Sequence, residues 1–280
     1  MTITSGTQLK DLIKNLARKN SADSQILLRS YITERFLERL SDSNYKNNFI
    51  IKGGMLISAM VGIKNRSTMD LDASIKGFSL NMDELKSVVE NICSVNLNDG
   101  VTFEIKSLTE IMDEADYPGI RISMNGFYDG IRTPVKLDIS TGDVITPNEI
   151  VFSYQLMFEN RKINLWSYNI ETVLAEKLES MIARTITNTR MRDFYDVYLL
   201  TKIYSEVIDY KILNLALKAT STKRNTITLM DNAEKVFDEL LTDSGIINLW
   251  QRYQSNYNYA NGISWNTVVD SAKNLYLKIK

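Results

Sequence analysis

Three aspartates in this sequence have the type and spacing of metal ligands. Asp70 and Asp72 are separated by one residue in STMDLDASI, and Asp138 lies in the middle of PVKLDIS. Apolar and polar residues alternate in both segments, as in a β-strand, so Asp70 and Asp72 project from one face, roughly 7 Å apart at the backbone. Neighbouring carboxylates repel one another unless a cation neutralises them. We therefore predict that Asp70, Asp72 and Asp138 hold a metal, the other interpretation of the first pair being a solvated strand face.

The chain contains no histidine. This absence excludes a Ser-His-Asp or Cys-His nucleophile system and a zinc site with histidine ligands. Acid–base and electrostatic chemistry must then come from carboxylates, lysine, arginine, tyrosine or a hard metal ion. Because oxygen ligands predominate, we expect Mg²⁺ or Mn²⁺.

A glycine pair, Gly53 and Gly54, ends the apolar run NFIIK and precedes a helical stretch. Glycine lets the backbone approach a phosphate closely, and a helix N-terminus presents unpaired amides. A lone glycine pair is more often a plain tight turn, but the nearby aspartates favour a phosphate-binding loop. Arg66, just before the first aspartate pair, could bind a phosphate or an aspartate.

Two further groups of charged residues lie in the last third of the chain. Lys177 falls on the apolar stripe of IETVLAEKLESMIAR, where a lysine either extends to water or meets an anion such as a triphosphate. Asp193 and Asp196 are three residues apart in RMRDFYDVYLL, so they are neighbours on one helix face. They form either a functional pair or a surface ion-pair cluster with the arginines before them.

These residues require a sheet framed by helices. Helical spacing of apolar residues occupies the chain before about residue 45, a period of two dominates from Asn47 to about residue 140, and helical spacing returns after residue 170. We predict N-terminal helices over 1–45, an α/β domain over 46–168 and a helical domain over 169–280.

The composition is that of a globular protein. The 280 residues are 44% hydrophobic and 24% charged, and a single cysteine, Cys93, excludes a disulfide within the chain. The first residues lack the apolar core of a signal peptide, and the longest apolar run is too short to span a bilayer. We therefore expect a cytoplasmic protein.

The overall charge gives no field that would hold a polyanion. Lys and Arg number 33 and Asp and Glu 34, for a formal net charge of -1. Contact with a nucleic acid must therefore come from a local basic patch. The candidates for this patch are Lys218, Lys223, Arg224, Arg184 and Arg190.

Several segments, in this order, resemble the AbiEii/AbiGii nucleotidyltransferase-like toxins of abortive-infection, type IV toxin–antitoxin systems. They are RSYITERFLERLSDSNYKNNFIIKGGMLI, RSTMDLDASI, VKLDIS, ETVLAEKLESMIAR and RMRDFYDVYLL, with a weaker resemblance in WQRYQSNYNYA and ISWNTVV. The resemblance spans most of the chain. It implies an α/β (α+β) nucleotidyltransferase domain of the DNA-polymerase-β-like type, with a mixed sheet flanked by helices and a helical C-terminal domain.

The resemblance also assigns residues. The family's motifs fall, in order, on Gly53, Gly54, Asp70 and Asp72, on Lys136 and Asp138, on Lys177, and on Asp193 and Asp196. The expected catalytic residues are Asp70, Asp72, Asp138, Lys177, Asp193 and Asp196. The first three are also the expected metal ligands, with Asp138 as general base. The expected nucleotide-binding residues are Gly53, Gly54, Arg66, Ser67, Thr68, Lys136 and Lys177. The wider superfamily favours Gly-Ser in the loop, so a serine contact to phosphate is either missing here or supplied by Ser67 or Thr68.

Family members studied as enzymes transfer nucleotides, some of them onto the 3′ end of tRNA, which blocks translation. The resemblance therefore implies a phage-defence toxin that uses NTP and Mg²⁺ to transfer NMP to RNA, with tRNA as the expected acceptor. It also implies a cognate antitoxin that acts indirectly, as a repressor. Two alternatives stay open: an inactive nucleotide-binding module that acts through a partner, and a transferase that modifies a protein or a small molecule.

Overall fold

The computed structural model describes residues 3–78, 81–112 and 118–280. The chain divides into two compact units. The first consists of Met1–Asp143 and Glu149–Ser167, and the second of Val144–Asn148 and Tyr168–Lys280. Buried apolar side chains form a core in each unit.

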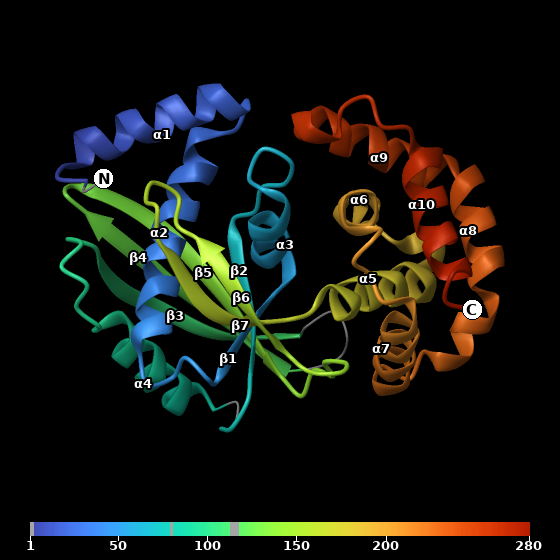
Figure 1. The fold of residues 1–280 in the computed structure, drawn as a ribbon, viewed down its shortest axis with the longest axis horizontal. Coiled ribbons are helices and arrows are strands. Elements are labelled where there is room, and N and C mark those ends of the chain that lie inside the picture. The colour runs from blue at the N-terminus through green and yellow to red at the C-terminus, as the bar shows by residue number, and fades with distance from the viewer. Residues whose placement is uncertain (1–2, 79–80, 113–117) are drawn as a thin grey trace. The chain divides into compact units, whose positions relative to one another are not determined.

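Within the described residues, the first unit is built on a seven-stranded mixed sheet (Figure 1). Its strands are β1 (Phe49–Lys52), β2 (Asp70–Ile75), β3 (Thr102–Met112), β4 (Pro118–Tyr128), β5 (Ile131–Thr141), β6 (Ile150–Gln155) and β7 (Lys162–Ser167). They lie in the order β3-β4-β5-β2-β1-β7-β6. β2 is parallel to β5 and β1 is parallel to β7, whereas the other neighbouring pairs are antiparallel.

Side-chain alternation explains why these segments are strands. The apolar positions of β2, namely Leu71, Ala73 and Ile75, are buried, whereas Asp70 and Asp72 on the other face are only half-buried. β5 repeats the pattern, with Val135, Leu137 and Ile139 buried. The predicted alternation is thus confirmed, and the carboxylates lie on the face opposite this apolar layer.

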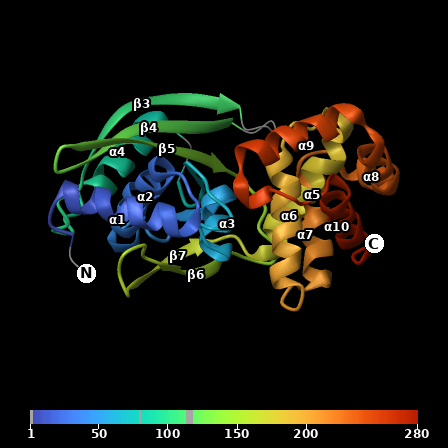
Figure 2. The same ribbon diagram turned by 90° about the horizontal axis from the view of Figure 1, so that it is seen from above.

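Helices flank the sheet. They are α1 (Gly6–Asn20), α2 (Ser24–Asp42), α3 (Gly53–Val61) and α4 (Met82–Cys93). Helix α2 begins where the Asp23 side chain accepts the amide hydrogens of Gln25 and Ile26, and it packs against β5 and β7 (Figure 2). Helix α3 follows β1 directly and packs on β1 and β2, so the glycine pair lies where a strand becomes a helix.

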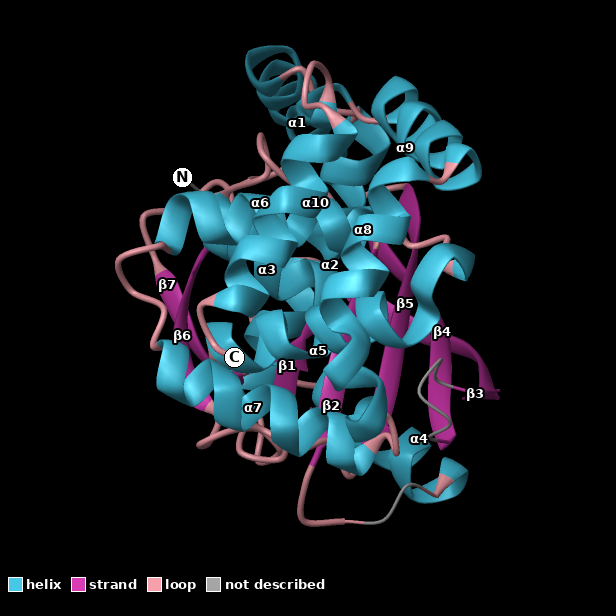
Figure 3. Cartoon of the chain, turned by 90° about the vertical axis from the view of Figure 1, so that its right-hand side faces the viewer, coloured by secondary structure: helices cyan, strands magenta, loops and turns pink. Residues whose placement is uncertain are grey.

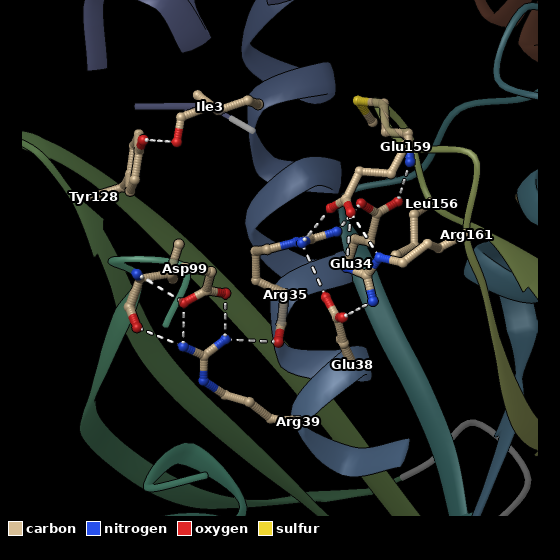
Figure 4. A network of polar contacts seen from close by, with 12 residues as sticks. Ile3, Glu34, Arg35, Glu38, Arg39, Asp99, Tyr128, Leu156, Glu159 and Arg161 are labelled. Carbon is tan, nitrogen blue, oxygen red and sulfur yellow. Dashed lines mark hydrogen bonds and ion pairs between the residues drawn. The ribbon is translucent and has the colours of Figure 1, made fainter. Parts of the chain in front are cut away.

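Charged residues of α2 are buried and bind distant loops of the first unit (Figure 4). Arg39 donates to both carboxylate oxygens of Asp99, at 2.9 and 2.7 Å, and to the Val101 carbonyl. Arg35 pairs with Glu34 at 2.6 Å and with Glu159 at 3.0 Å. Because Asp99 precedes β3 and Glu159 joins β6 to β7, these pairs fix α2 against both ends of the sheet.

The second unit is helical in its described residues, as Figure 3 shows in cyan. Its helices are α5 (Ile170–Arg184), α6 (Met191–Tyr204), α7 (Tyr210–Lys223), α8 (Ala233–Thr242), α9 (Ser244–Asn256) and α10 (Trp265–Leu277), with short 3-10 turns at Thr185–Thr187, Ile227–Asn232 and Asn258–Ala260. Phe194, Trp250 and Trp265 lie in its core. No helix among the described residues is long and apolar enough to cross a membrane.

Candidate active site

The pairing of neighbouring strands assembles a row of charged residues across the sheet. Lys52 of β1 pairs with Asp72 of β2, Asp72 with Asp138 of β5, and Asp138 with Arg121 of β4. Residues paired in this way project from the same face of a sheet. The row therefore reads Lys52, Asp72, Asp138, Arg121, with two carboxylates between two cations.

Asp70 belongs to the next row. It is paired with Lys136 of β5 and lies two residues before Asp72, hence on the same face. Asp70 is half-buried and Lys136 is exposed. The three aspartates predicted as metal ligands are thus neighbours on one face, with Lys136 beside them.

Asp138 and Asp70 lie close enough to Asp72 to influence its ionisation. Burial raises the pKa of Asp72 to about 6, and the negative charges of Asp138 and Asp70 contribute to this rise. The Lys52 ammonium and the Gly54 amide oppose it, the amide donating to Asp72 Oδ2 at 3.4 Å. A carboxyl group that is costly to ionise beside two others is stabilised in its charged form by a bound cation.

Arg121 engages both oxygens of Asp138. Its Nε donates to Oδ1 at 2.8 Å and its Nη2 to Oδ2 at 2.7 Å, which is a bidentate ion pair. The Asp138 hydrogen bonds raise the pKa of Arg121, and the charges of Asp138, Asp70 and Asp72 add to this rise. The negative charges of all three carboxylates therefore stabilise the charged form of Arg121.

The glycine pair is packed directly against Asp72. Gly53 has a φ of +64°, which favours glycine, and a Cβ there would lie 2.1 Å from Asp72 Oδ2. A Cβ on Gly54 would lie 2.8 Å from the Thr68 hydroxyl oxygen and 2.9 Å from a guanidinium nitrogen of Arg66. Gly53 is thus required by its φ and by its close approach to Asp72, whereas a side chain at position 54 would displace the ends of the Thr68 and Arg66 side chains.

Arg66, Ser67 and Thr68 are buried next to this loop. Arg66 Nη1 donates to the Ser67 carbonyl at 2.6 Å, and the Ser58 hydroxyl donates to the Arg66 carbonyl at 2.6 Å. These hydrogen bonds of Arg66 fix the backbone of the segment that precedes β2. The Thr68 hydroxyl lies where the side chain of a serine at position 54 would project.

The charged residues of the second unit form a cluster of their own. Lys177 Nζ of α5 lies 2.5 Å from Asp193 Oδ1 and 2.9 Å from Asp196 Oδ2, both carboxylates being on α6. Asp196 is fully buried, and Lys177 is 13% exposed. Burial by itself lowers the pKa of Lys177, but the two carboxylates outweigh it and raise the pKa, so the lysine stays charged. Lys177 therefore does pair with anions, as one of the two interpretations of its position required, and these anions are the carboxylates of Asp193 and Asp196.

The basic patch expected in the second unit is partly neutralised. Arg224 pairs with Glu179 at 2.5 Å and with Glu176 at 3.2 Å. Arg190 lies 3.7 Å from Asp193. Lys218 of α7 is exposed.

Three residues of the site were not predicted. They are Lys52, Arg121 and Asp143, the last of which accepts from Lys52 Nζ at 2.9 Å and from the Ser140 hydroxyl at 2.7 Å. Lys52 had a local signal, since it is the charged residue that ends a buried strand just before the glycines. The alternation in GIRISMN puts Arg121 on a polar face, but only the pairing of β4 with β5 brings it to Asp138.

The donor type and the shared face of the three aspartates fit a hard divalent cation. Across residues 3–78, 81–112 and 118–280, however, no three carboxylate or thiol side chains are gathered closely enough to hold a metal ion. In the observed arrangement, Arg121 donates to both oxygens of Asp138.

Comparison with solved structures shows the fold. MenT4, a nucleotidyltransferase toxin from Mycobacterium tuberculosis H37Rv, has a TM-score of 0.54 at 13% identity, over 97% of this chain and 99% of that chain. JHP933 from Helicobacter pylori has a TM-score of 0.51 at 18% identity, over 92% of this chain and 94% of that chain. The mixed sheet with flanking helices is therefore a nucleotidyltransferase fold, as predicted.

Sequence comparison shows the family. No curated protein matches the sequence as a relative. The family model described as the nucleotidyl transferase AbiEii toxin of type IV toxin–antitoxin systems matches residues 35–271, which include every motif residue named above. The resemblance seen in the sequence motifs is confirmed, and this chain belongs to the AbiEii nucleotidyltransferase toxin family.

Proposed function

We propose that this protein is a metal-dependent nucleotidyltransferase toxin that transfers NMP from an NTP to RNA, with the 3′ end of tRNA as the expected acceptor. The observation that carries the proposal is the group of Asp70, Asp72 and Asp138 on one face of β2 and β5, beside a glycine loop that opens α3. Its family supports a nucleotidyltransferase toxin. The proposed substrates would place its action in the cytoplasm.

The proposed chemistry is a displacement at the α-phosphorus of the NTP. The acceptor hydroxyl oxygen forms a bond to this phosphorus, the bond between the α-phosphorus and the bridging oxygen breaks, and pyrophosphate leaves. Asp138 accepts the proton of the hydroxyl, since the chain has no histidine to do so. Divalent cations held by Asp70, Asp72 and Asp138 would neutralise charge on the reacting phosphates.

The remaining residues would bind the nucleotide. The amides of Gly53 and Gly54 begin α3, and a helix N-terminus attracts phosphate oxygens. Lys136 is exposed beside Asp70 and could pair with a phosphate. Lys177 is the remaining candidate for a triphosphate contact, and its ammonium, which is paired with Asp193 and Asp196, would have to bind a phosphate oxygen besides these two carboxylates.

The family also supports an antitoxin partner. We propose that this antitoxin acts indirectly, as a repressor, and that the pair serves in phage defence. Growth of cells that express the toxin alone, measured with and without the cognate antitoxin and under phage challenge, tests this part of the proposal.

The transfer itself is tested by labelling. The full chain is incubated with total RNA, a protein extract and each of the four NTPs in turn, labelled at the α-phosphate. We expect label in RNA, and no label with Asp72→Asn. Label in the protein or small-molecule fraction would instead support a transferase with another acceptor.

One observation favours a second candidate, a nucleotide-binding module without catalysis. Both oxygens of Asp138 are engaged by Arg121, which leaves the proposed general base occupied. Nucleotide binding without label in any fraction would support this candidate.

A further inference from the structure

Arg121 and Lys52 stand at the two ends of the charged row, but they are held differently. Lys52 forms a salt bridge at 2.9 Å with Asp143, whose side chain is only 6% exposed. Within the described parts of the chain, Arg121 has Asp138 as its ion-pair partner and makes no hydrogen bond to any other residue. Arg121 is also the more exposed of the pair, at 38% against 18% for Asp138. Of the cations in this row, Arg121 is therefore the one that can leave.

A metal ion and Arg121 compete for the same carboxylate. The two hydrogen bonds, at 2.8 and 2.7 Å, occupy both oxygens of Asp138 that a cation would use. Two cations on one carboxylate also repel each other, and this repulsion is strong in a partly buried site. The bound guanidinium therefore opposes the binding of a cation to Asp138, and its departure would remove this opposition.

A released guanidinium needs another anion. The planar fork of arginine binds phosphate as well as carboxylate in a bidentate manner. In the reaction proposed above, phosphate enters this site with the substrate. An exchange of carboxylate for phosphate would keep Arg121 paired while Asp138 binds the cation.

We infer that Arg121 is a positioning residue that blocks Asp138 in the metal-free protein and transfers to a substrate phosphate when the cation binds. This inference rests on the proposed function. The contact between Arg121 and Asp138, the proposed general base, is then a resting state of an active enzyme and not a sign of lost activity. Cation and substrate then bind cooperatively, because each removes the obstacle to the other, and such coupling acts equally in both directions.

The test measures Mn²⁺ affinity of the full chain by the electron paramagnetic resonance signal of free Mn²⁺, without substrate. Arg121→Gln removes the charge, and Arg121→Lys keeps the charge but loses the fork. Arg132→Gln is the matched control, because Arg132 is an exposed arginine on the same face of β5, six residues from Asp138. Asp70→Asn reports whether Mn²⁺ binds at the aspartates at all.

We expect Arg121→Gln to bind Mn²⁺ about tenfold more tightly than the wild type, a typical size for coupling between sites. Arg121→Lys should be intermediate and Arg132→Gln unchanged. If Arg121→Gln binds Mn²⁺ no more tightly than the wild type while Asp70→Asn weakens binding, the inference is overturned and the metal site stands. If Asp70→Asn changes nothing in any background, the metal site and the inference both fail.

Added substrates identify the phosphate. With α,β-methylene analogues of the NTPs, the affinity of the wild type for Mn²⁺ should rise towards that of Arg121→Gln. If a short single-stranded RNA instead raises the Mn²⁺ affinity of the wild type to that of Arg121→Gln, the phosphate that binds Arg121 comes from the acceptor. If neither the NTP analogues nor the RNA remove this difference in Mn²⁺ affinity, Arg121 does not transfer to a substrate phosphate and the inference is overturned.

Discussion

At the scale of single residues, the glycine loop and the aspartates pack too closely to admit an additional side-chain atom. Gly53 and Asp72 illustrate this, because a single added carbon at Gly53 would lie 2.1 Å from a carboxylate oxygen. The same carboxylate accepts the Gly54 amide hydrogen and is paired with Lys52 across the strands. A change at the glycine must therefore displace Asp72 or distort the start of α3.

Gly53→Ala tests this contact. It combines a positive φ with the clash against Asp72, so we expect the free energy of unfolding to fall by more than about 1 kcal/mol and Mn²⁺ binding to be lost. Gly62→Ala is the control, because Gly62 also has a positive φ (+86°) but a Cβ there would meet nothing within 4 Å. Urea unfolding and Mn²⁺ titration of both variants provide the comparison. Equal losses in the two would show that backbone strain, and not the contact with Asp72, is responsible.

A second residue, Asp143, makes the first unit sensitive to acid. Burial raises the pKa of this carboxyl, but the Lys52 ammonium and the hydroxyls of Ser140 and Ser74 outweigh burial and lower it to about 2. A folded-state pKa below the unfolded value contributes stability above about pH 4, which disappears as the pH falls to about 2. The difference between the folded-state pKa of Asp143 and its unfolded value corresponds to about 2 kcal/mol of folding free energy.

Asp143→Asn should therefore lower the free energy of unfolding by about 2 kcal/mol at pH 7, with the difference from the wild type vanishing between about pH 4 and pH 2. Asp11→Asn, at an exposed position of α1, should show no such pH-dependent difference. Urea unfolding at each pH measures both. A difference that stays constant over this pH range would contradict the assignment to Asp143.

At the scale of secondary-structure elements, helices α5 and α6 are joined by a buried charge cluster. Lys177 on one helix neutralises Asp193 and Asp196 on the other. The apolar stripe of α5 alone would suggest that methionine fits at position 177. The structure reverses this expectation, because without the ammonium the fully buried Asp196 loses its positive partner.

Lys177→Met should accordingly lower the free energy of unfolding by about 3–5 kcal/mol, the cost of removing one partner of a buried ion pair. Combining it with Asp196→Asn should cost less than the sum of the two single changes, because the second change removes the unpaired charge. Urea unfolding of the wild type, both single variants and the double variant measures this coupling. Strict additivity would mean that Lys177 and Asp196 do not stabilise one another.

At the scale of the whole molecule, the balance of charge bears on the proposed acceptor. A chain with a formal net charge of -1 has no general attraction for RNA, so RNA must bind through a few exposed basic residues. Ion pairs inside the second unit already engage Arg224. Lys218, which is exposed, is the better candidate among the residues predicted for this patch.

If RNA is the acceptor, its affinity should fall steeply between low and physiological salt, since phosphate contacts release counterions. Lys218→Gln should lower the affinity and reduce the salt dependence, whereas Arg224→Gln should leave both nearly unchanged. Fluorescence anisotropy with a labelled RNA measures both quantities. An affinity that does not change with salt would favour a protein or small-molecule acceptor.

Local periodicity in the sequence was sufficient to predict the strands that carry the aspartates and one side of the site, but it did not identify β6 and β7. The period of two in STMDLDASI and PVKLDIS puts Asp70, Asp72 and Asp138 opposite a buried apolar layer, and this depends only on the geometry of a strand. The glycine pair and the motif order likewise lie within short segments, which is why the family could be predicted before the fold was known.

Only the tertiary structure decided which charges meet. The pairing of β5 with both β2 and β4 brings Arg121 to Asp138, and the packing of α6 on α5 gives Lys177 its carboxylates. A shift of one residue in the strand pairing would have moved these partners to opposite faces. Such partners lie far apart in sequence and are selected by strand register and burial, neither of which is a local property of the chain.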